Sequence, residues 1–208
     1  MADPQAPHSI REGFLYGLGA YIWWGLVPIY FRWLGGLSTF AFVAHRIVWS
    51  ALLLAVVITL ARRWPDMLRC FRTPALLLPL CVSSVLVAYN WMIYVICVSA
   101  GEIVQASLGY FILPLVSVVM GMIVFHERMR PPQLLAIGCA AVGVLSLTWS
   151  AGVFPSLALA VALSFCVYGM IRKKVPVDGL IGLTVETMVL APIALGCLVA
   201  GYWQHGAA

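Results

Sequence analysis

Charged side chains are scarce in this 208-residue sequence. Lysine and arginine number 12 and aspartate and glutamate 7, so that 9% of the residues are charged, whereas 63% are hydrophobic. A typical soluble domain has about 25% charged and about 45–50% apolar residues. Because a soluble fold of this size could not bury so much apolar surface, the composition excludes a soluble enzyme, a disordered chain and a disulfide scaffold.

The sequence also lacks the motifs of metal sites and membrane hydrolases. None of its six cysteines forms a C-x-x-C pair, and neither H-E-x-x-H nor G-x-S-x-G occurs. We therefore expect no catalytic residue, no metal and no cofactor. Ser38, which follows Gly36-Leu37, has only His45 nearby as a base, so an intramembrane serine protease ranks third among the hypotheses.

Long apolar runs fill most of the chain. A membrane-spanning helix needs about 20 apolar residues, and the runs do not alternate with the two-residue period of a strand. The sequence therefore predicts an all-α polytopic membrane protein with about seven transmembrane helices, at residues 13–33, 39–61, 75–99, 103–125, 132–150, 154–171 and 179–201.

Basic residues stand in short clusters between these runs. Ten of the 12 fall on one predicted side of the membrane, namely Arg11, Arg62, Arg63, Arg69, Arg72, Arg128, Arg130, Arg172, Lys173 and Lys174. The positive-inside rule makes this side cytoplasmic, with residues 1–12 as a cytoplasmic N-terminal tail. We expect a short interfacial helix within residues 62–74. No aromatic residues alternate with the basic ones outside the spans, so a nucleic-acid partner is not expected despite the net charge of +5.

Ionisable side chains inside lipid are costly and mark candidate sites. His45 and Arg46 lie about 10–12 Å from the outer end of the second span, and Glu186 lies about 10 Å from the inner end of the last. Each has a structural alternative. Arg46 could extend to the outer headgroups, His45 could make an interhelical hydrogen bond, and Glu186 could form a structural ion pair.

A polar residue with aromatic neighbours interrupts the third span. This group comprises Tyr89, Asn90, Trp91 and Tyr94, of which Asn90 and Tyr94 are four residues apart and share a helix face. The buried amide could line a polar cavity, and hydrogen bonding between helices is the alternative.

A second polar segment lies in the fourth span, before Pro114. This proline frees a backbone carbonyl one turn earlier, close to Tyr110, and Gly109 permits a close helix approach. A kink beside Ser107 and Tyr110 suits a gated cavity, whereas a kink that serves packing alone is the alternative.

The spans show a weak internal repeat of opposite orientation. Trp24 in the first span corresponds to Tyr168 in the sixth, each followed by glycine, and Arg46 then corresponds to Glu186. Secondary transporters often contain two such inverted halves. The pattern predicts a first five-helix repeat at residues 13–150 and a second repeat, incomplete after its second helix, at residues 151–208.

Several strings of residues carry a family resemblance. They are Ala44-His45-Arg46-Ile47-Val48-Trp49-Ser50, Asn90-Trp91-Met92-Ile93-Tyr94, Ala106-Ser107-Leu108-Gly109-Tyr110-Phe111 with Pro114, Glu127-Arg128, Arg172-Lys173-Lys174-Val175-Pro176 and Glu186-Thr187. Together they resemble the RarD group of EamA-type transporters, within the drug/metabolite transporter superfamily. The resemblance extends from about residue 13 to the last span.

This resemblance implies a ten-helix inner-membrane protein of bacteria, built from two inverted five-helix halves. It implies alternating access and export or exchange of small metabolites or drugs, and we expect the present chain to be truncated after helix 7. The residues expected to bind substrate are His45, Arg46, Asn90, Trp91, Tyr94, Ser107, Tyr110 and Glu186. Glu186 is also the candidate for proton coupling. The alternative is a non-transporting membrane remnant or interaction protein, and the oligomeric state stays open.

Overall fold

The computed structural model describes residues 6–33, 38–126, 129–152 and 154–205. The chain divides into two compact units, residues 1–37 and residues 38–208. The described element of the first unit is α1 (Ala6–Trp33), a helix of 28 residues. It begins inside the expected N-terminal tail, so that residues 6–12 are helical, whereas residues 1–5 lie outside the described part. Large side chains are exposed along α1, among them Phe14, Tyr21 and Trp23.

The described part of the second unit contains seven helices. They are α2 (Thr39–Leu60), α3 (Trp64–Arg72), α4 (Pro74–Ser99), α5 (Ile103–Phe125), α6 (Pro131–Ala151), α7 (Ser156–Lys174) and α8 (Gly179–His205). The six long helices lie within a few residues of the ranges expected from hydropathy. Helix α3 is the short helix expected within residues 62–74. The Glu127-Arg128 motif lies outside the described residues.

Length and composition qualify six described helices as membrane spans, namely α2 and α4 to α8. Their mean hydropathy over an 18-residue window lies between 1.4 and 2.1, yet at most 39% of each window is buried inside the protein. Exposed apolar surface on this scale requires lipid as the solvent, and helices satisfy their own backbone hydrogen bonds there. The chain is therefore an all-α polytopic membrane protein. The expected first span, α1, is not among these six helices.

Local sequence signals set several helix ends. The Ser38 Oγ accepts a hydrogen bond from the backbone N–H of Ala41 and caps the N-terminus of α2. Pro74 and Pro131 occupy the first positions of α4 and α6, where a missing N–H costs nothing. Gly152 ends α6 with a positive φ of 64°, which glycine adopts without strain.

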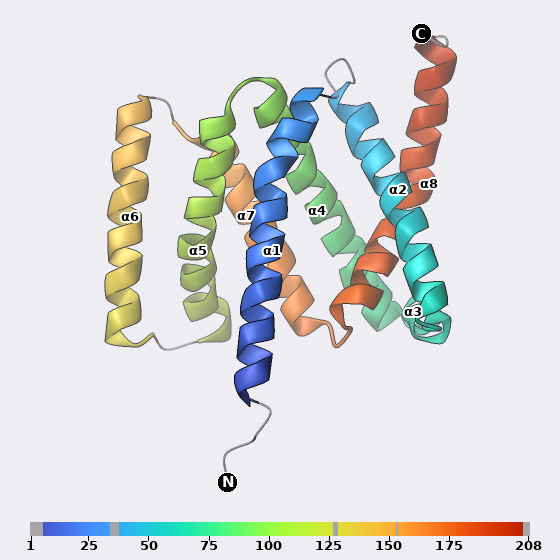
Figure 1. The fold of residues 1–208 in the computed structure, drawn as a ribbon, viewed down its shortest axis with the longest axis horizontal. Coiled ribbons are helices and arrows are strands. Elements are labelled where there is room, and N and C mark those ends of the chain that lie inside the picture. The colour runs from blue at the N-terminus through green and yellow to red at the C-terminus, as the bar shows by residue number, and fades with distance from the viewer. Residues whose placement is uncertain (1–5, 34–37, 127–128, 153, 206–208) are drawn as a thin grey trace. The chain divides into compact units, whose positions relative to one another are not determined.

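Helix α4 lies at the centre of the second unit and packs against α2, α5, α7 and α8 (Figure 1). Helix α2 also packs against α8, and α5 against α7. The contact between α5 and α7 is close at Gly109, because a Cβ there would lie 3.0 Å from the Ala158 carbonyl oxygen. Gly109 thus permits the close approach that the sequence predicts. Helix α6 lies at the edge beside α5 (Figure 1).

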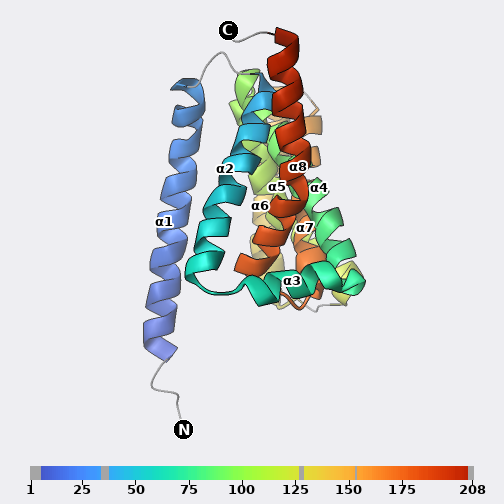
Figure 2. The same ribbon diagram turned by 90° about the vertical axis from the view of Figure 1, so that its right-hand side faces the viewer.

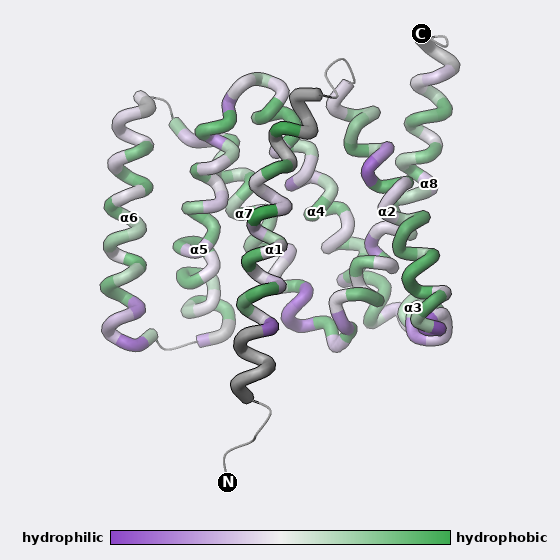
Figure 3. Tube along the Cα trace, in the orientation of Figure 1, coloured by the Kyte–Doolittle hydropathy of each residue, from purple (hydrophilic) through white to green (hydrophobic). Residues whose placement is uncertain are grey.

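One end of the second unit is polar, and we call it the basic end. Here α3 connects α2 to α4, and α7 turns into α8 at residues 175–178. Figure 2 shows α3 lying across this end rather than along the long helices. Hydrophilic residues gather here in α3, in the turn between α7 and α8 and at the start of α6 (Figure 3).

Helix α3 presents two different faces. Met67 and Cys70 are buried in an apolar cluster with Val175, Ile181 and Val185 from the α7–α8 segment. Burial raises the pKa of the Cys70 thiol. The rest of the α3 surface exposes arginines and apolar side chains such as Leu68 and Phe71. This division suits a helix at a membrane surface.

Candidate functional site

Arg46 lies against an aromatic ring in the first half of α2. Its guanidinium carbon is 3.9 Å from the ring centroid of Trp91 on α4, which is a cation–π arrangement. Seven residues separate Arg46 from the start of α2, so that it lies about 10 Å inside the helix. Contact with a π face stabilises a cation where water is excluded.

Two tyrosines lie beside this pair. The rings of Tyr94 on α4 and Tyr110 on α5 meet edge to face, with centroids 6.0 Å apart. Both are close enough to Arg46 to interact with its charge. Tyr94 is 9% exposed and Tyr110 39% exposed, so that the group opens toward Tyr110. We call Arg46, Trp91, Tyr94 and Tyr110 the arginine cluster.

The structure places two expected binding residues elsewhere on these helices. His45 is exposed, and as the next residue on α2 it is rotated by about 100° from Arg46. Ser107 lines a cavity of about 330 Å³ beside α5. The remaining lining residues are Glu102, Ile103, Val104, Gln105, Leu108, Phe111, Leu147 and Pro155.

Gln105 is a polar lining residue of this cavity that was not among the residues expected to bind substrate. Its Nε2 lies 3.4 Å from Glu102 Oε2, to which it donates a hydrogen bond. Its Oε1 is buried and has no hydrogen-bond partner among the residues that the structure describes.

Asn90 connects two helices. It is 1% exposed, and its Nδ2 donates hydrogen bonds to the Val161 carbonyl oxygen at 2.8 Å and to the Ser164 Oγ at 3.0 Å, both on α7. Its neighbour Trp91 instead contacts Arg46. The structure therefore gives Asn90 the arrangement of the interhelical alternative that the sequence left open.

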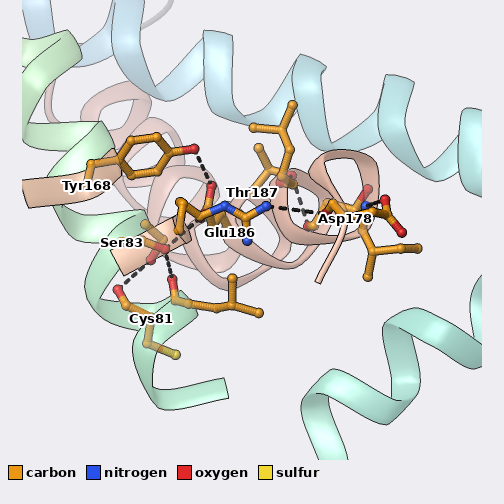
Figure 4. A network of polar contacts seen from close by, with 12 residues as sticks. Cys81, Ser83, Tyr168, Asp178, Glu186 and Thr187 are labelled. Atoms are coloured by element: carbon orange, nitrogen blue, oxygen red, sulfur yellow. Dashed lines mark hydrogen bonds and ion pairs between the residues drawn. The ribbon is translucent and has the colours of Figure 1, made fainter. Parts of the chain in front are cut away.

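Glu186 on α8 belongs to a second polar group, which is separate from the arginine cluster. It is 1% exposed. Its Oε1 accepts a hydrogen bond from Ser83 Oγ at 2.6 Å and lies 3.6 Å from Arg172 Nε, while its Oε2 accepts from the Tyr168 hydroxyl at 3.3 Å. Figure 4 shows Ser83 and Tyr168 converging on Glu186 from two other helices. We call Ser83, Tyr168, Arg172 and Glu186 the carboxylate cluster.

Sequence reasoning missed three members of the carboxylate cluster. Ser83 is one of two adjacent serines in an apolar run, and this pair was the available signal. Tyr168 stood out as part of the repeat but not as a partner of Glu186. Arg172 was counted as a loop residue, whereas it lies in the last turn of α7 and its side chain is 14% exposed.

Ion pairs tie the two segments of the basic end together. Arg63, just before α3, donates from Nη2 to Asp178 Oδ2 at 2.5 Å and from Nε to Asp66 Oδ2 at 2.8 Å. The hydrogen bond from Arg63 lowers the pKa of the Asp178 carboxyl below its ordinary value, and the pKa of Arg63 is raised by the same contact. In the described part of the chain, no three His, Cys, Asp or Glu side chains gather as a metal site requires.

The model of the EamA-like transporter family matches residues 11–149. The chain belongs to the EamA-like transporter family. The matched region of this EamA-like chain includes the whole arginine cluster. It ends before Tyr168, Arg172 and Glu186.

Curated relatives agree with this assignment to the EamA-like family. The chain is 43% identical over 192 residues to an uncharacterized transporter of Pseudomonas aeruginosa, covering 91% of this chain and 64% of the relative. It is 40% identical over 184 residues to protein RarD of Escherichia coli, covering 88% and 62%. It is 37% identical over 202 residues to the uncharacterized transporter YojE of Bacillus subtilis, covering 95% and 68%.

The EamA-like chain thus spans a little under two thirds of the length of the first two of these relatives. No solved structure matches it.

Proposed function

We propose that this chain forms part of a RarD-like secondary transporter that exports or exchanges small metabolites or drugs across the bacterial inner membrane. Transport proceeds by alternating access between two inverted halves, residues 13–150 and a second half that starts at residue 151. The N-terminus and the basic end face the cytoplasm, as the positive-inside rule requires. The family assignment supports transport, and the two clusters support the site.

The observation that carries this proposal is the placement of two charged groups at matching depths. Arg46 lies seven residues after the start of α2, and Glu186 lies seven residues after the start of α8. Helices α2 and α8 pack against each other and start from opposite ends of the unit (Figure 1). Each charge is therefore about 10 Å from its own end, so that the two lie on either side of the middle of a core about 30 Å thick.

The arginine cluster is suited to an anionic substrate group. The Arg46 guanidinium supplies charge, the Tyr94 and Tyr110 hydroxyls can donate hydrogen bonds, and the aromatic faces exclude water. Glu186 is the candidate for proton coupling, since a buried carboxylate can exchange one proton per cycle. In this conformation its partners are Ser83, Tyr168 and Arg172, so a direct pair between Arg46 and Glu186 would belong to another state.

An uptake and efflux screen with the intact protein in proteoliposomes tests this function. The probes are radiolabelled organic anions, neutral metabolites and aromatic drugs, each with and without a pH gradient. We expect flux of at least one carboxylate-bearing probe, and its loss in Arg46→Ala. Arg69→Ala, which removes an exposed arginine of α3, is the control and should transport like the wild type. Flux that persists in Arg46→Ala contradicts the site, and no flux of any probe supports a non-transporting remnant.

A further inference from the structure

Arg172 extends from the basic end back toward the buried carboxylate. It lies in the last turn of α7, and besides its contact with Glu186 it donates from Nη2 to the backbone oxygen of Asp178 at 3.3 Å. Its Nη1 is buried and has no hydrogen-bond partner within the described ranges. A single side chain thus contacts both Glu186 and the turn between α7 and α8.

Gly182 provides the space for this arginine. It lies on α8 one turn before Glu186, and the Arg172 guanidinium covers its Cα so closely that an added Cβ would overlap Cζ and both Nη atoms. By contrast, a Cβ at Gly196 on the same helix would meet nothing within 4 Å. Any side chain at position 182 would therefore displace the guanidinium from its present place.

Asp178 continues the connection outward. Its backbone oxygen accepts from Arg172, its Oδ1 accepts from the Ile181 N–H at 3.1 Å, and its Oδ2 accepts from Arg63. Arg63 precedes α3 and follows α2. The contacts thus run without a break from buried Glu186 to the exposed junction of α2 and α3.

We propose that Arg172 is a positioning residue for Glu186, seated by Gly182, and that this chain of contacts holds the basic end closed in the present conformation. The inference rests on the proposed function, in which Glu186 is the coupling group. The carboxylate of Glu186 holds Arg172 in place. Arg172 in turn holds the turn between α7 and α8, in which Asp178 binds Arg63. Loss of the Glu186 charge releases Arg172, and the turn between α7 and α8 then separates from α3 more often.

Cys70 is a native reporter of this separation. Cys70 is 3% exposed because α3 packs against Val175 and Ile181, which precede and follow Asp178 in the chain. A thiol in this position reacts with maleimide only when α3 separates from the turn between α7 and α8. Its labelling rate therefore measures the fraction of molecules in which the two segments are apart. Cys97 and Cys166 are buried among the long helices and serve as internal controls.

The experiment measures N-ethylmaleimide labelling of each cysteine by peptide mass spectrometry, with the intact protein in lipid vesicles. We expect Gly182→Ala and Glu186→Gln each to raise Cys70 labelling by about fivefold or more, with Cys97 and Cys166 unchanged. The double variant should label no faster than either single variant, because both changes break the same contact. Gly196→Ala should label at the wild-type rate.

Three outcomes would overturn this inference. One is wild-type labelling of Cys70 in both Gly182→Ala and Glu186→Gln. Another is a double variant in which the two effects multiply, since independent effects would mean that Gly182 acts without Arg172 and Glu186. The third is an equal rise in labelling at Cys70, Cys97 and Cys166, because this would report a general loosening of the protein. Since the measurement uses no substrate, its result stands apart from whether the proposed transport occurs.

Discussion

At the scale of single residues, two ionisable groups sit at similar depths in very different surroundings. Arg46 is placed against the face of Trp91, which stabilises the cation through its π electrons. Glu186 is held by a serine, a tyrosine and an arginine. This difference suits their proposed roles, because Arg46 supplies a cation among aromatic rings, whereas Glu186 is a carboxylate held by three polar side chains.

Arg46→Lys tests the stacking directly. Lysine keeps the positive charge but loses the planar face that lies on Trp91. We expect the KM for a transported anion to rise by about tenfold, which matches the usual strength of a cation–π contact. Concentration-dependent flux in proteoliposomes measures this change. Arg69→Lys is the matched control, and an unchanged KM in Arg46→Lys would mean that charge alone matters.

Asn90 is expected to stabilise the fold rather than to bind substrate. Asn90→Ala removes two hydrogen bonds to α7, so the free energy of unfolding should fall by about 1 kcal/mol, with the KM for transport unchanged. Unfolding in detergent with increasing denaturant measures the stability. Thr148→Val is the control, because the Thr148 hydroxyl donates its hydrogen bond within α6, to the Val144 carbonyl oxygen. A raised KM at wild-type stability would place Asn90 in the binding site.

At the scale of helices, α5 and α7 are held together by a glycine contact and small apolar side chains. Ala158 and Ala162 of α7 pack against Leu108 and Ile112 of α5, around Gly109. Close packing of small residues is a main source of helix association in lipid. The separation of these helices therefore depends on the absence of a side chain at position 109.

Gly109→Ala should destabilise the protein. Its Cβ would meet the Ala158 backbone oxygen at 3.0 Å and Val161 at 3.1 Å, and overpacking of this kind costs about 1–3 kcal/mol. Gly143→Ala on α6 should instead stabilise the protein. A Cβ at this position would meet nothing within 4 Å, and alanine is more favourable than glycine in a helix by about 0.5–1 kcal/mol. Equilibrium unfolding of both variants checks the pair. Equal effects of the two substitutions would contradict the close contact.

The contact between Arg63 and Asp178 should change with pH only at acidic pH, where Asp178 becomes protonated. Since Arg63 lowers the Asp178 pKa, this contact is fully present above the ordinary aspartate pKa and is lost as pH falls through the lowered value. Carboxylate titration by infrared spectroscopy, with Asp178→Asn as the difference reference, measures the pKa. In Arg63→Gln the Asp178 pKa should rise toward the ordinary range. An unchanged pKa in that variant would exclude Arg63 as its cause.

At the scale of the whole molecule, the sequence predicts helices better than it predicts contacts. Hydropathy locates the long helices because lipid requires about 20 apolar residues per span. The mixture of arginines and apolar residues between residues 62 and 74 predicts a short interfacial helix. Both expectations are confirmed for the described helices α2 to α8.

The partners of the candidate residues could not be predicted in the same way. A helix in lipid is apolar on every face, so its pattern does not show which face packs against protein. Ser83 lies 103 residues before Glu186, and nothing in the spacing of the two indicates that they meet. Arg46 and Trp91, in contrast, were both selected as unusual residues of their spans, although the contact between them was not foreseen.

The most direct measurement of the proposed mechanism compares two kinds of flux in Glu186→Gln. Proton-driven accumulation of a transported anion requires the carboxylate to exchange a proton, whereas exchange of labelled for unlabelled substrate at equal pH does not. In proteoliposomes we expect Glu186→Gln to lose the accumulation and to keep the exchange, and Arg46→Ala to lose both. Wild-type accumulation in Glu186→Gln would contradict the proposed mechanism.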